Sequence, residues 1–275
     1  MIGSLDAAGI RRMLTATSSS NLDELEVFSS IDSTNTYLLK QPAPLPGRFR
    51  LAIADQQTAG RGRHSRTWQS PPESGLYLSL AYTFAQVLDN LPALTLTLGV
   101  AVVNALSETG VDNAALKWPN DIVVNGGKLG GILTEVRSRE AGSGITVIAG
   151  IGINLEFQQP LDLGADVTTL QRAVDLKSIV AVPAERGQLA GLVVEHMMAA
   201  ITRFERDGFR GFADAWRRLD WLCGKEITIV SADERITGQA AGVDEDGALL
   251  VDIDSRRQRV VSGSITEVGG RTTPR

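Results

Sequence analysis

The chain has 275 residues, of which 43% are hydrophobic, and carries a formal net charge of −5. This composition supports a packed core, argues against disorder, and fits one large or two modest domains. The acidic balance argues against non-specific nucleic-acid binding, which depends on clustered Lys and Arg. A single cysteine and two histidines exclude an intramolecular disulfide and a Cys-rich or His-rich zinc site. Neither a signal sequence nor an apolar run of membrane-spanning length is evident, so we expect a cytoplasmic protein without membrane contact.

Short elements of both kinds are expected in the first third of the chain. The pattern predicts a helix over residues 3–16, which the polar run 18–21 breaks, and a short strand over 26–28. The apolar runs 51–54 and 76–80 each predict a further strand. The residues between these two runs are therefore expected to form a loop that joins two strands of a sheet.

A polar cluster, residues 29–35, precedes a helical run. Ser, Thr, Asn and Asp at this position are typical of a helix cap. A helix N-terminus also presents free N–H groups that suit an anion or a polar ligand head. Capping alone and a ligand site therefore both remain open for Ser33, Thr34 and Asn35.

The loop between the two predicted strands is rich in glycine and arginine over residues 60–68, which we call the arginine loop. Its glycines permit a close backbone approach to a ligand, and its arginines suit a phosphate or a carboxylate. The arginines are Arg61, Arg63 and Arg66. A solvated basic loop and a nucleic-acid patch are the alternatives.

The middle of the chain predicts a helix followed by an antiparallel meander. The helix covers residues 92–109 and is largely apolar. Asn125-Gly126 is a strong hairpin signal between strands at 122–124 and 128–136, and a third strand is expected over 145–155. The central sheet is thus expected to be at least partly antiparallel.

Alternation along the third strand places Gly150, Gly152 and Asn154 on one face. A row of glycines on one face indicates that something approaches the backbone closely. On the preceding strand, alternation places Lys128 on the face of Gly130. If both faces look the same way, a lysine and an asparagine border a floor that is free of side chains.

The last part of the chain changes from helices to short strands. Residues 184–206 predict an amphipathic helix whose apolar stripe contains His196, which we interpret as a packed histidine and not as a ligand. A second short helix over 209–219 follows. The strands are expected at 226–230, 235–243, 248–253 and 257–266. This change predicts a larger domain, 1–222, and a small β-barrel domain, 223–275.

The order and spacing of several motifs resemble the biotin protein ligases. They are Ser-Thr-Asn at 33–35, the arginine loop, Lys-Trp-Pro-Asn-Asp at 117–121, Lys-Leu-Gly-Gly-Ile-Leu at 128–133 and Gly-Ile-Gly-Ile-Asn at 150–154. The resemblance implies an α+β fold related to class II aminoacyl-tRNA synthetases and lipoate ligases. This fold has a mixed, largely antiparallel sheet with flanking helices and a small C-terminal β-barrel. It also implies that ATP activates biotin to biotinyl-5′-AMP, which then passes biotin to a lysine of a biotin carboxyl carrier domain, as in acetyl-CoA carboxylase.

The resemblance also implies roles for individual residues. The biotin-binding residues would be Ser33, Thr34, Asn35, Gln57, Gly60, Arg61, Arg63, Lys128, Gly130 and Gly131. The residues that bind ATP or the adenylate would be Arg61, Arg63, Arg66, Trp68, Asn120, Asp121, Lys128, Gly152 and Asn154. Lys128, Arg63 and Asp121 would be catalytic, with Lys128 stabilising charge at the carboxylate and α-phosphate. Asp121 would either coordinate Mg²⁺ or orient Lys128.

Other interpretations remain open beside this one. Lys117 could be an ordinary surface lysine.

The family loop usually has glycine where this chain has Ser65, which restricts the loop. The segment before Val27 is short for a helix-turn-helix domain, so we expect a ligase without specific DNA binding, and we lean to a homodimer. A ligase for lipoate or a similar acid, and a nucleic-acid-binding regulator, are the rival hypotheses.

Overall fold

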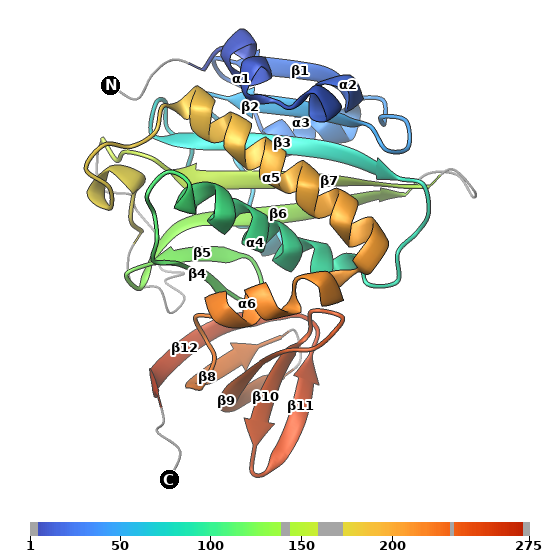
Figure 1. Ribbon diagram of the computed structural model, residues 1–275. Helices are drawn as coiled ribbons and strands as arrows, with labels where there is room; N and C mark the ends of the chain where they lie inside the picture. The colour runs from blue at the N-terminus through green and yellow to red at the C-terminus, as the bar shows by residue number, and fades with distance from the viewer. Residues whose placement is uncertain (1–4, 139–143, 159–172, 232–233, 272–275) are drawn as a thin grey trace.

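The computed structural model describes residues 5–138, 144–158, 173–231 and 234–271. Within these ranges the chain forms a seven-stranded sheet and a five-stranded sheet, with helices packed on the larger one (Figure 1). The mixed α+β class predicted from the sequence is therefore confirmed. No helix in the described ranges is long and apolar enough to cross a membrane.

The larger sheet has the spatial order β1-β2-β3-β7-β6-β5-β4. Its strands are β1 (Leu22–Phe28), β2 (Phe49–Ala54), β3 (Gly75–Phe84), β4 (Ala114–Lys117), β5 (Asp121–Val124), β6 (Gly127–Ser138) and β7 (Ile145–Asn154). Only β1 and β2 pair in parallel among these strands, and the other neighbours are antiparallel. The predicted hairpin is confirmed at Asn125 and Gly126, whose φ values of +51° and +73° fit the turn that such a pair favours.

The smaller sheet has the order β11-β10-β9-β8-β12. Its strands are β8 (Lys225–Val230), β9 (Arg235–Val243), β10 (Leu249–Ile253), β11 (Arg256–Val260) and β12 (Ser264–Arg271). The sequence predicted one strand over 257–266, and this is wrong. Because β11 pairs with β10 whereas β12 pairs with β8, the chain must cross the sheet between them. No ladder joins β11 to β12 in the described part of this sheet.

The helices are α1 (Ala7–Met13), α2 (Ala16–Asn21), α3 (Thr34–Lys40), α4 (Leu94–Ser107), α5 (Arg186–Asp207) and α6 (Ala213–Leu219). The expected single helix over 3–16 is wrong, although residues 3 and 4 lie outside the described ranges. The helix ends at Met13, and the Thr15 hydroxyl caps a second helix by accepting a hydrogen bond from Ser18 N–H. The serine-rich run therefore continues as a helix because a cap precedes it.

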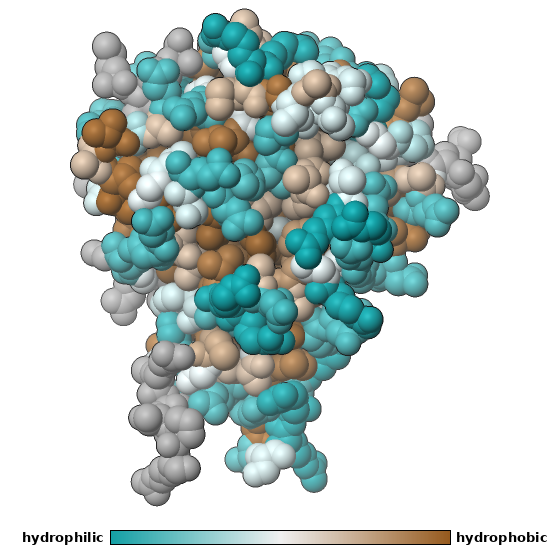
Figure 2. Space-filling view, viewed as in Figure 1, coloured by the Kyte–Doolittle hydropathy of each residue, from teal (hydrophilic) through white to brown (hydrophobic). Residues whose placement is uncertain are grey.

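The helices α4 and α5 cover one face of the large sheet, and α6 lies between the two sheets (Figure 1). The other face carries α3, whose Leu38 packs on Ala52, Ala81 and Ile148. On the surface that α4 and α5 present, hydrophilic residues are interspersed with smaller hydrophobic patches (Figure 2). His196 of α5 is partly buried, and its Nε2 lies 2.8 Å from Glu108 Oε1. It thus has a structural partner, as a packed histidine does.

Candidate active site

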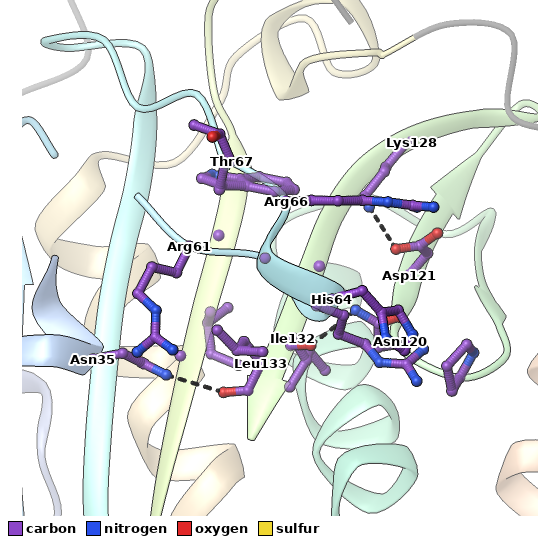
Figure 3. A pocket seen from close by; sticks show the side chains of 18 of the residues that line it. Asn35, Arg61, His64, Arg66, Thr67, Asn120, Asp121, Lys128, Ile132 and Leu133 are labelled. Carbon is purple, nitrogen blue, oxygen red and sulfur yellow. Dashed lines mark hydrogen bonds and ion pairs between the residues drawn. The ribbon is translucent and has the colours of Figure 1, made fainter. Parts of the chain in front are cut away.

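The pocket that gathers the predicted motifs lies on the α3 face of the large sheet (Figure 3). It is bounded by the start of α3, the arginine loop, β6, β7 and residues 263–265 of the smaller sheet. The predicted residues that line it are Ser33, Thr34, Asn35, Gln57, Arg61, Arg63, Arg66, Trp68, Asn120, Asp121, Lys128, Gly131 and Gly152. Sequence motifs that are far apart therefore meet at one site.

Hydroxyl and amide groups form one end of the pocket. Ser33 caps α3, since its side chain accepts a hydrogen bond from Thr36 N–H. Gln57 Oε1 accepts hydrogen bonds from Thr34 N–H at 2.9 Å and from Thr34 Oγ1 at 3.1 Å. The side chain of Thr34 also lies 2.7 Å from Ser79 Oγ, which the sequence gave no reason to single out. The capping residues thus cap the helix and also build a neutral, polar end of the pocket.

The glycines of β7 leave the space that other side chains of the protein occupy. A Cβ at Gly150 would lie 2.3 Å from Asn35 Oδ1, and a Cβ at Gly152 would lie 2.6 Å from the Trp68 ring. Real Cβ atoms do not approach so closely. The prediction that something approaches this strand is therefore correct, and the groups that approach are Asn35 and Trp68.

Lys128 does not share a face with Gly130, so that prediction is wrong. In the β5–β6 ladder Ile122 pairs with Gly130 whereas Val123 pairs with Lys128, which leaves one extra residue on β6. Such a bulge reverses the alternation of side chains. Lys128 Cε consequently lies 3.6 Å from the Cβ position of Gly131, on the pocket side.

Three predicted residues do not line the pocket. A Cβ at Gly60 would lie 2.3 Å from the carbonyl oxygen of Trp68, so glycine is needed there for loop packing. A Cβ at Gly130 would lie 2.7 Å from the carbonyl oxygen of Gly152. Asn154 donates from Nδ2 to the backbone carbonyls of Lys128 at 3.2 Å and Val174 at 3.1 Å. These contacts hold the backbone around the pocket together.

A cluster of charges forms the other end of the pocket. Asp121 lies between two lysines, with its oxygens 2.6 Å from Lys128 Nζ and 3.7 Å from Lys117 Nζ (Figure 3 shows the Lys128 pair). The side chain of Lys117 is only 4% exposed, so it is not an ordinary surface lysine. Burial opposes ionisation of Asp121, but the two lysines hold its pKa below the usual value. Burial also lowers the pKa of Lys117, and Asp121 partly offsets this effect.

The pairing of Asp121 with two ammonium groups does not suit a magnesium ligand. A carboxylate that already neutralises two cations attracts a third cation weakly. In the described ranges no group of three or more His, Cys, Asp or Glu side chains could hold a metal ion. The geometry therefore favours the orienting role for Asp121 over metal coordination.

The arginine loop folds back on itself as a narrow hairpin. Gly62 N–H donates to the carbonyl of Arg66 at 2.8 Å, and Trp68 N–H donates to the carbonyl of Gly60 at 3.0 Å. At its tip His64 and Ser65 have φ values of +52° and +59°. The left-handed region is unfavourable for residues with a side chain, so Ser65 occupies a position that favours glycine.

The pocket is also lined by further residues of the motifs, for which the sequence predicted no binding or catalytic role: Gly62, His64, Thr67, Lys117, Trp118, Pro119, Ile132, Leu133, Gly150 and Ile151. Sequence reasoning missed the lining residues outside the motifs, which are Leu78, Ser79, Gly263, Ser264 and Ile265. Trp118 Nε1 donates to the carbonyl of Gly247 at 3.0 Å, which ties the Trp-Pro motif to the smaller sheet. Residues 263–265 carried no signal in the sequence because only the packing of the two sheets brings them to the pocket.

Two parts of the chain match described families. Residues 27–154 match the Biotin/lipoate A/B protein ligase family, and residues 222–266 match the Biotin protein ligase C terminal domain. The chain is 31% identical over 242 residues to the bifunctional ligase/repressor BirA of Escherichia coli, covering 87% of this chain and 73% of that protein. It is 30% identical over 277 residues to the biotin–[acetyl-CoA-carboxylase] ligase of Mycobacterium tuberculosis, covering 96% of each.

Similarity extends to solved structures. The biotin protein ligase from Aquifex aeolicus in complex with biotin and ATP matches with a TM-score of 0.75 and 28% identity, covering 88% of this chain and 97% of that chain. The same protein without ligand matches with a TM-score of 0.71 and 25% identity, covering 90% of this chain and 99% of that chain. The structural matches and the sequence matches are thus to proteins of the same kind.

Proposed function

The chain belongs to the biotin protein ligase family, and we propose that its pocket carries out both half-reactions of such a ligase. In the first, the biotin carboxylate attacks the α-phosphate of ATP, which forms biotinyl-5′-AMP and releases pyrophosphate. In the second, a lysine amine attacks the activated carbonyl, so an amide bond forms and AMP leaves. The chain is an AMP-forming biotin ligase, as its relatives named biotin–[acetyl-CoA-carboxylase] ligase are.

The observation that carries this function is the division of one pocket into a neutral and a cationic end. Thr34 and Gln57 offer hydroxyl and amide groups at one end, where a neutral polar head such as the ureido group can bind. Lys128 and Arg63 supply positive charge at the other end, where a carboxylate and a phosphate would meet. Placing these charges in advance lowers the barrier to attack of one anion on another.

We assign the following roles to individual residues. Lys128 stabilises the charge that develops at the α-phosphate, and Asp121 orients Lys128. Trp68 packs against Gly152 and offers an aromatic surface for the adenine. Magnesium enters with the phosphates of ATP, because it keeps most of its ligands as water and phosphate oxygen.

A lipoate ligase on the same scaffold is the rival hypothesis, and the comparisons do not favour it. The family that matches residues 27–154 includes both kinds of ligase. The relatives at 30–31% identity are named for biotin ligase activity or as BirA. Calorimetric titration with biotin and with lipoate separates the two, since heat with lipoate alone would contradict our assignment.

Several further properties belong to this proposal. The acceptor is a lysine of a biotin carboxyl carrier domain. The chain divides into a catalytic domain, 1–222, and a smaller domain, 223–275, and the two sheets support this division. We place the reaction in the cytoplasm, expect two chains to pair through an exposed sheet edge, and expect no specific DNA binding. The net charge of −5 supports the last point.

The first experiment mixes the purified protein with biotin, ATP and Mg²⁺ and adds a carrier domain last. We expect biotin-dependent pyrophosphate release, bound biotinyl-5′-AMP by mass spectrometry, and then a mass gain on the carrier lysine. No adenylate with biotin, but adenylate with lipoate, would contradict the proposal.

Lys128→Ala tests the catalytic assignment. Because a charge aligned with the transition state is lost, we expect the rate of pyrophosphate release to fall by about a hundredfold or more. The matched control is Lys177→Ala, since Lys177 also pairs with a carboxylate, that of Glu156, but lies outside the pocket. A rate that is nearly unchanged in Lys128→Ala would remove Lys128 from the catalytic role.

A further inference from the structure

The arginine loop is held to the sheet by one carboxylate that the motifs do not include. Glu135 of β6 accepts two hydrogen bonds from Arg61, with Nη1–Oε2 at 2.9 Å and Nη2–Oε1 at 2.8 Å. The two parallel contacts form the bidentate geometry that gives an Arg–carboxylate pair both strength and direction. The arginine that begins the loop is therefore fixed to the strand that the loop must cover.

A third donor joins this pair from the start of α3. Asn35 of α3 donates from Nδ2 to Glu135 Oε2 at 2.9 Å. Arg61 and Asn35 lie next to each other at one end of the pocket (Figure 3). Both line the pocket, whereas Glu135 does not. Glu135 thus stands behind two pocket residues and holds them together.

The contacts continue from Asn35 into the neutral end of the pocket. Asn35 Oδ1 accepts a hydrogen bond from Ser79 Oγ at 2.6 Å, and Ser79 Oγ lies 2.7 Å from Thr34 Oγ1. Thr34 N–H then donates to Gln57 Oε1 at 2.9 Å.

The other end of this chain returns to the arginine loop. Gln57 Nε2 donates to Ser70 Oγ at 2.9 Å, and Ser70 Oγ donates to the carbonyl of Trp68 at 3.2 Å. The network therefore begins at the first arginine of the loop and ends at its last residue, passing through groups that a ligand head would contact.

We propose that Glu135 is a positioning residue that latches the arginine loop over the pocket, and that Asn35 links this latch to the ligand-binding floor. The proposal rests on the proposed function, because it assigns the latch the task of retaining the adenylate. A mixed anhydride is destroyed by water, so a loop that stays closed protects it. A ligand that orders Thr34 and Asn35 also orders the carboxylate that holds Arg61.

The pair of Arg61 and Glu135 holds the loop through groups of the protein itself. A loop of polar side chains without partners is mobile. Arg61 has its partner on the neighbouring strand, so the closed arrangement has a contact within the chain that supports it. The pair is partly exposed, at 43% and 21% of the two side chains, so the loop can still open.

Limited digestion with trypsin tests the latch without any substrate. The peptide bonds after Arg63 and Arg66 lie in the hairpin of the arginine loop, and a protease cleaves such bonds faster when the segment opens. Mass spectrometry measures the rate of cleavage at these two bonds. We expect this rate to be about five to thirty times higher in Glu135→Gln than in the wild type. Glutamine keeps the shape and the acceptor for Asn35 but removes the charge that binds Arg61.

The matched control is Glu24→Gln. Glu24 pairs with Arg50 across β1 and β2, and neither residue lines the pocket or belongs to the arginine loop. We expect its cleavage rate to equal that of the wild type. Equal rates in Glu135→Gln and the wild type would overturn the proposal.

Arg61→Gln should raise the cleavage rate by a similar factor, and adding Glu135→Gln to it should have no further effect. Additive effects of the two changes would overturn the latch as well.

A second measurement concerns the adenylate. Biotinyl-5′-AMP formed in Glu135→Gln should be released about five to thirty times faster than from the wild type, while pyrophosphate release in a single turnover changes less than about threefold. An adenylate that is retained as in the wild type would overturn the proposal. If the wild type forms no adenylate, the proposed function fails instead, and the digestion result still decides whether Glu135 holds the loop.

Discussion

At the scale of single residues, the tip of the arginine loop has an unfavourable backbone conformation. Ser65 has a φ of +59°, where residues other than glycine are disfavoured, and His64 beside it has +52°. The hairpin around them is closed by the hydrogen bond from Gly62 N–H to the Arg66 carbonyl. The closed loop of this chain is thus less favourable than one with glycine at this position.

Ser65→Gly is expected to relieve this cost. The left-handed backbone disfavours serine by about 1–2 kcal/mol, and the extra freedom of glycine in the unfolded chain offsets about half of that. We expect a gain in stability of about 0.5–1 kcal/mol in urea denaturation and slower adenylate release. Glu73, at φ +57° and outside the pocket, is the control, because Glu73→Gly should change stability alone. A loss of stability in Ser65→Gly would contradict this account.

Lys117 is a second residue whose individual position matters, because it is buried beside Asp121 in the charged end of the pocket. It shares Asp121 with Lys128, and the three charges lie within the pocket wall. Without Lys117, the carboxylate would bind Lys128 more tightly and hold it away from the phosphates. This residue therefore acts through its neighbours.

Lys117→Met tests that role while keeping a side chain of similar length. We expect pyrophosphate release to fall by about tenfold, which corresponds to about 1.4 kcal/mol. Stability should not fall, because the change also removes the unfavourable burial of a charge. Unchanged pyrophosphate release would show that Lys117 serves only the packing of β4.

At the scale of elements, one buried ion pair fixes the long helix to the sheet. Arg186, the first residue of α5, has a side chain that is 3% exposed and pairs with Asp55 at the end of β2. Asp55 is two residues before Gln57, so this pair also fixes the backbone that leads into the pocket. Burial of an arginine requires such a partner.

Asp55→Ala is expected to destabilise the protein strongly because it leaves the Arg186 charge buried without a partner. Removing one member of a buried pair costs about 3 kcal/mol or more. Urea denaturation measures the loss. Asp23→Ala is the control, since its pair with Arg48 is more exposed and should contribute under about 1 kcal/mol. Equal losses in the two variants would show that the Arg186 pair does not hold α5 to β2.

At the scale of the whole molecule, the smaller sheet packs at Gly247 against the start of α4 and the turn between β4 and β5. Its carbonyl accepts the hydrogen bond from Trp118, and a Cβ at this position would lie 2.9 Å from both Ala93 Cβ and Leu96 Cδ1. Residues 263–265 of the same smaller sheet line the pocket. The position of the smaller sheet therefore determines part of the pocket wall.

Gly247→Ala is expected to disturb this contact. Its φ is +81°, and that of Gly126, which has open space around its Cβ position, is +73°. Gly126→Ala should therefore lose about 1 kcal/mol from backbone strain alone, and Gly247→Ala about 2–3 kcal/mol because of the added collision. We also expect slower adenylate formation in Gly247→Ala only. Equal stability losses would show that the smaller sheet does not pack tightly against the start of α4.

The sequence by itself determined the features that depend on neighbouring residues. It predicted the turn at Asn125-Gly126, a helix cap within residues 29–35 and the helix that became α4, because local backbone preferences and apolar spacing decide these. The motif order was enough to indicate the family. It also brought most of the proposed site residues to attention, since each lies in a motif whose glycines and charges are unusual.

Only the tertiary structure decided the features that depend on contacts between distant segments. The pairing of β7 with both β3 and β6 and the bulge that turns Lys128 into the pocket follow from long-range register. The burial of Lys117 and the approach of residues 263–265 follow from packing of one layer on another. Glu135 belongs to the same class: its carboxylate has meaning only because Arg61 and Asn35, distant along the chain, converge on it. Such convergence leaves no periodic or local pattern, and so the sequence could not reveal it.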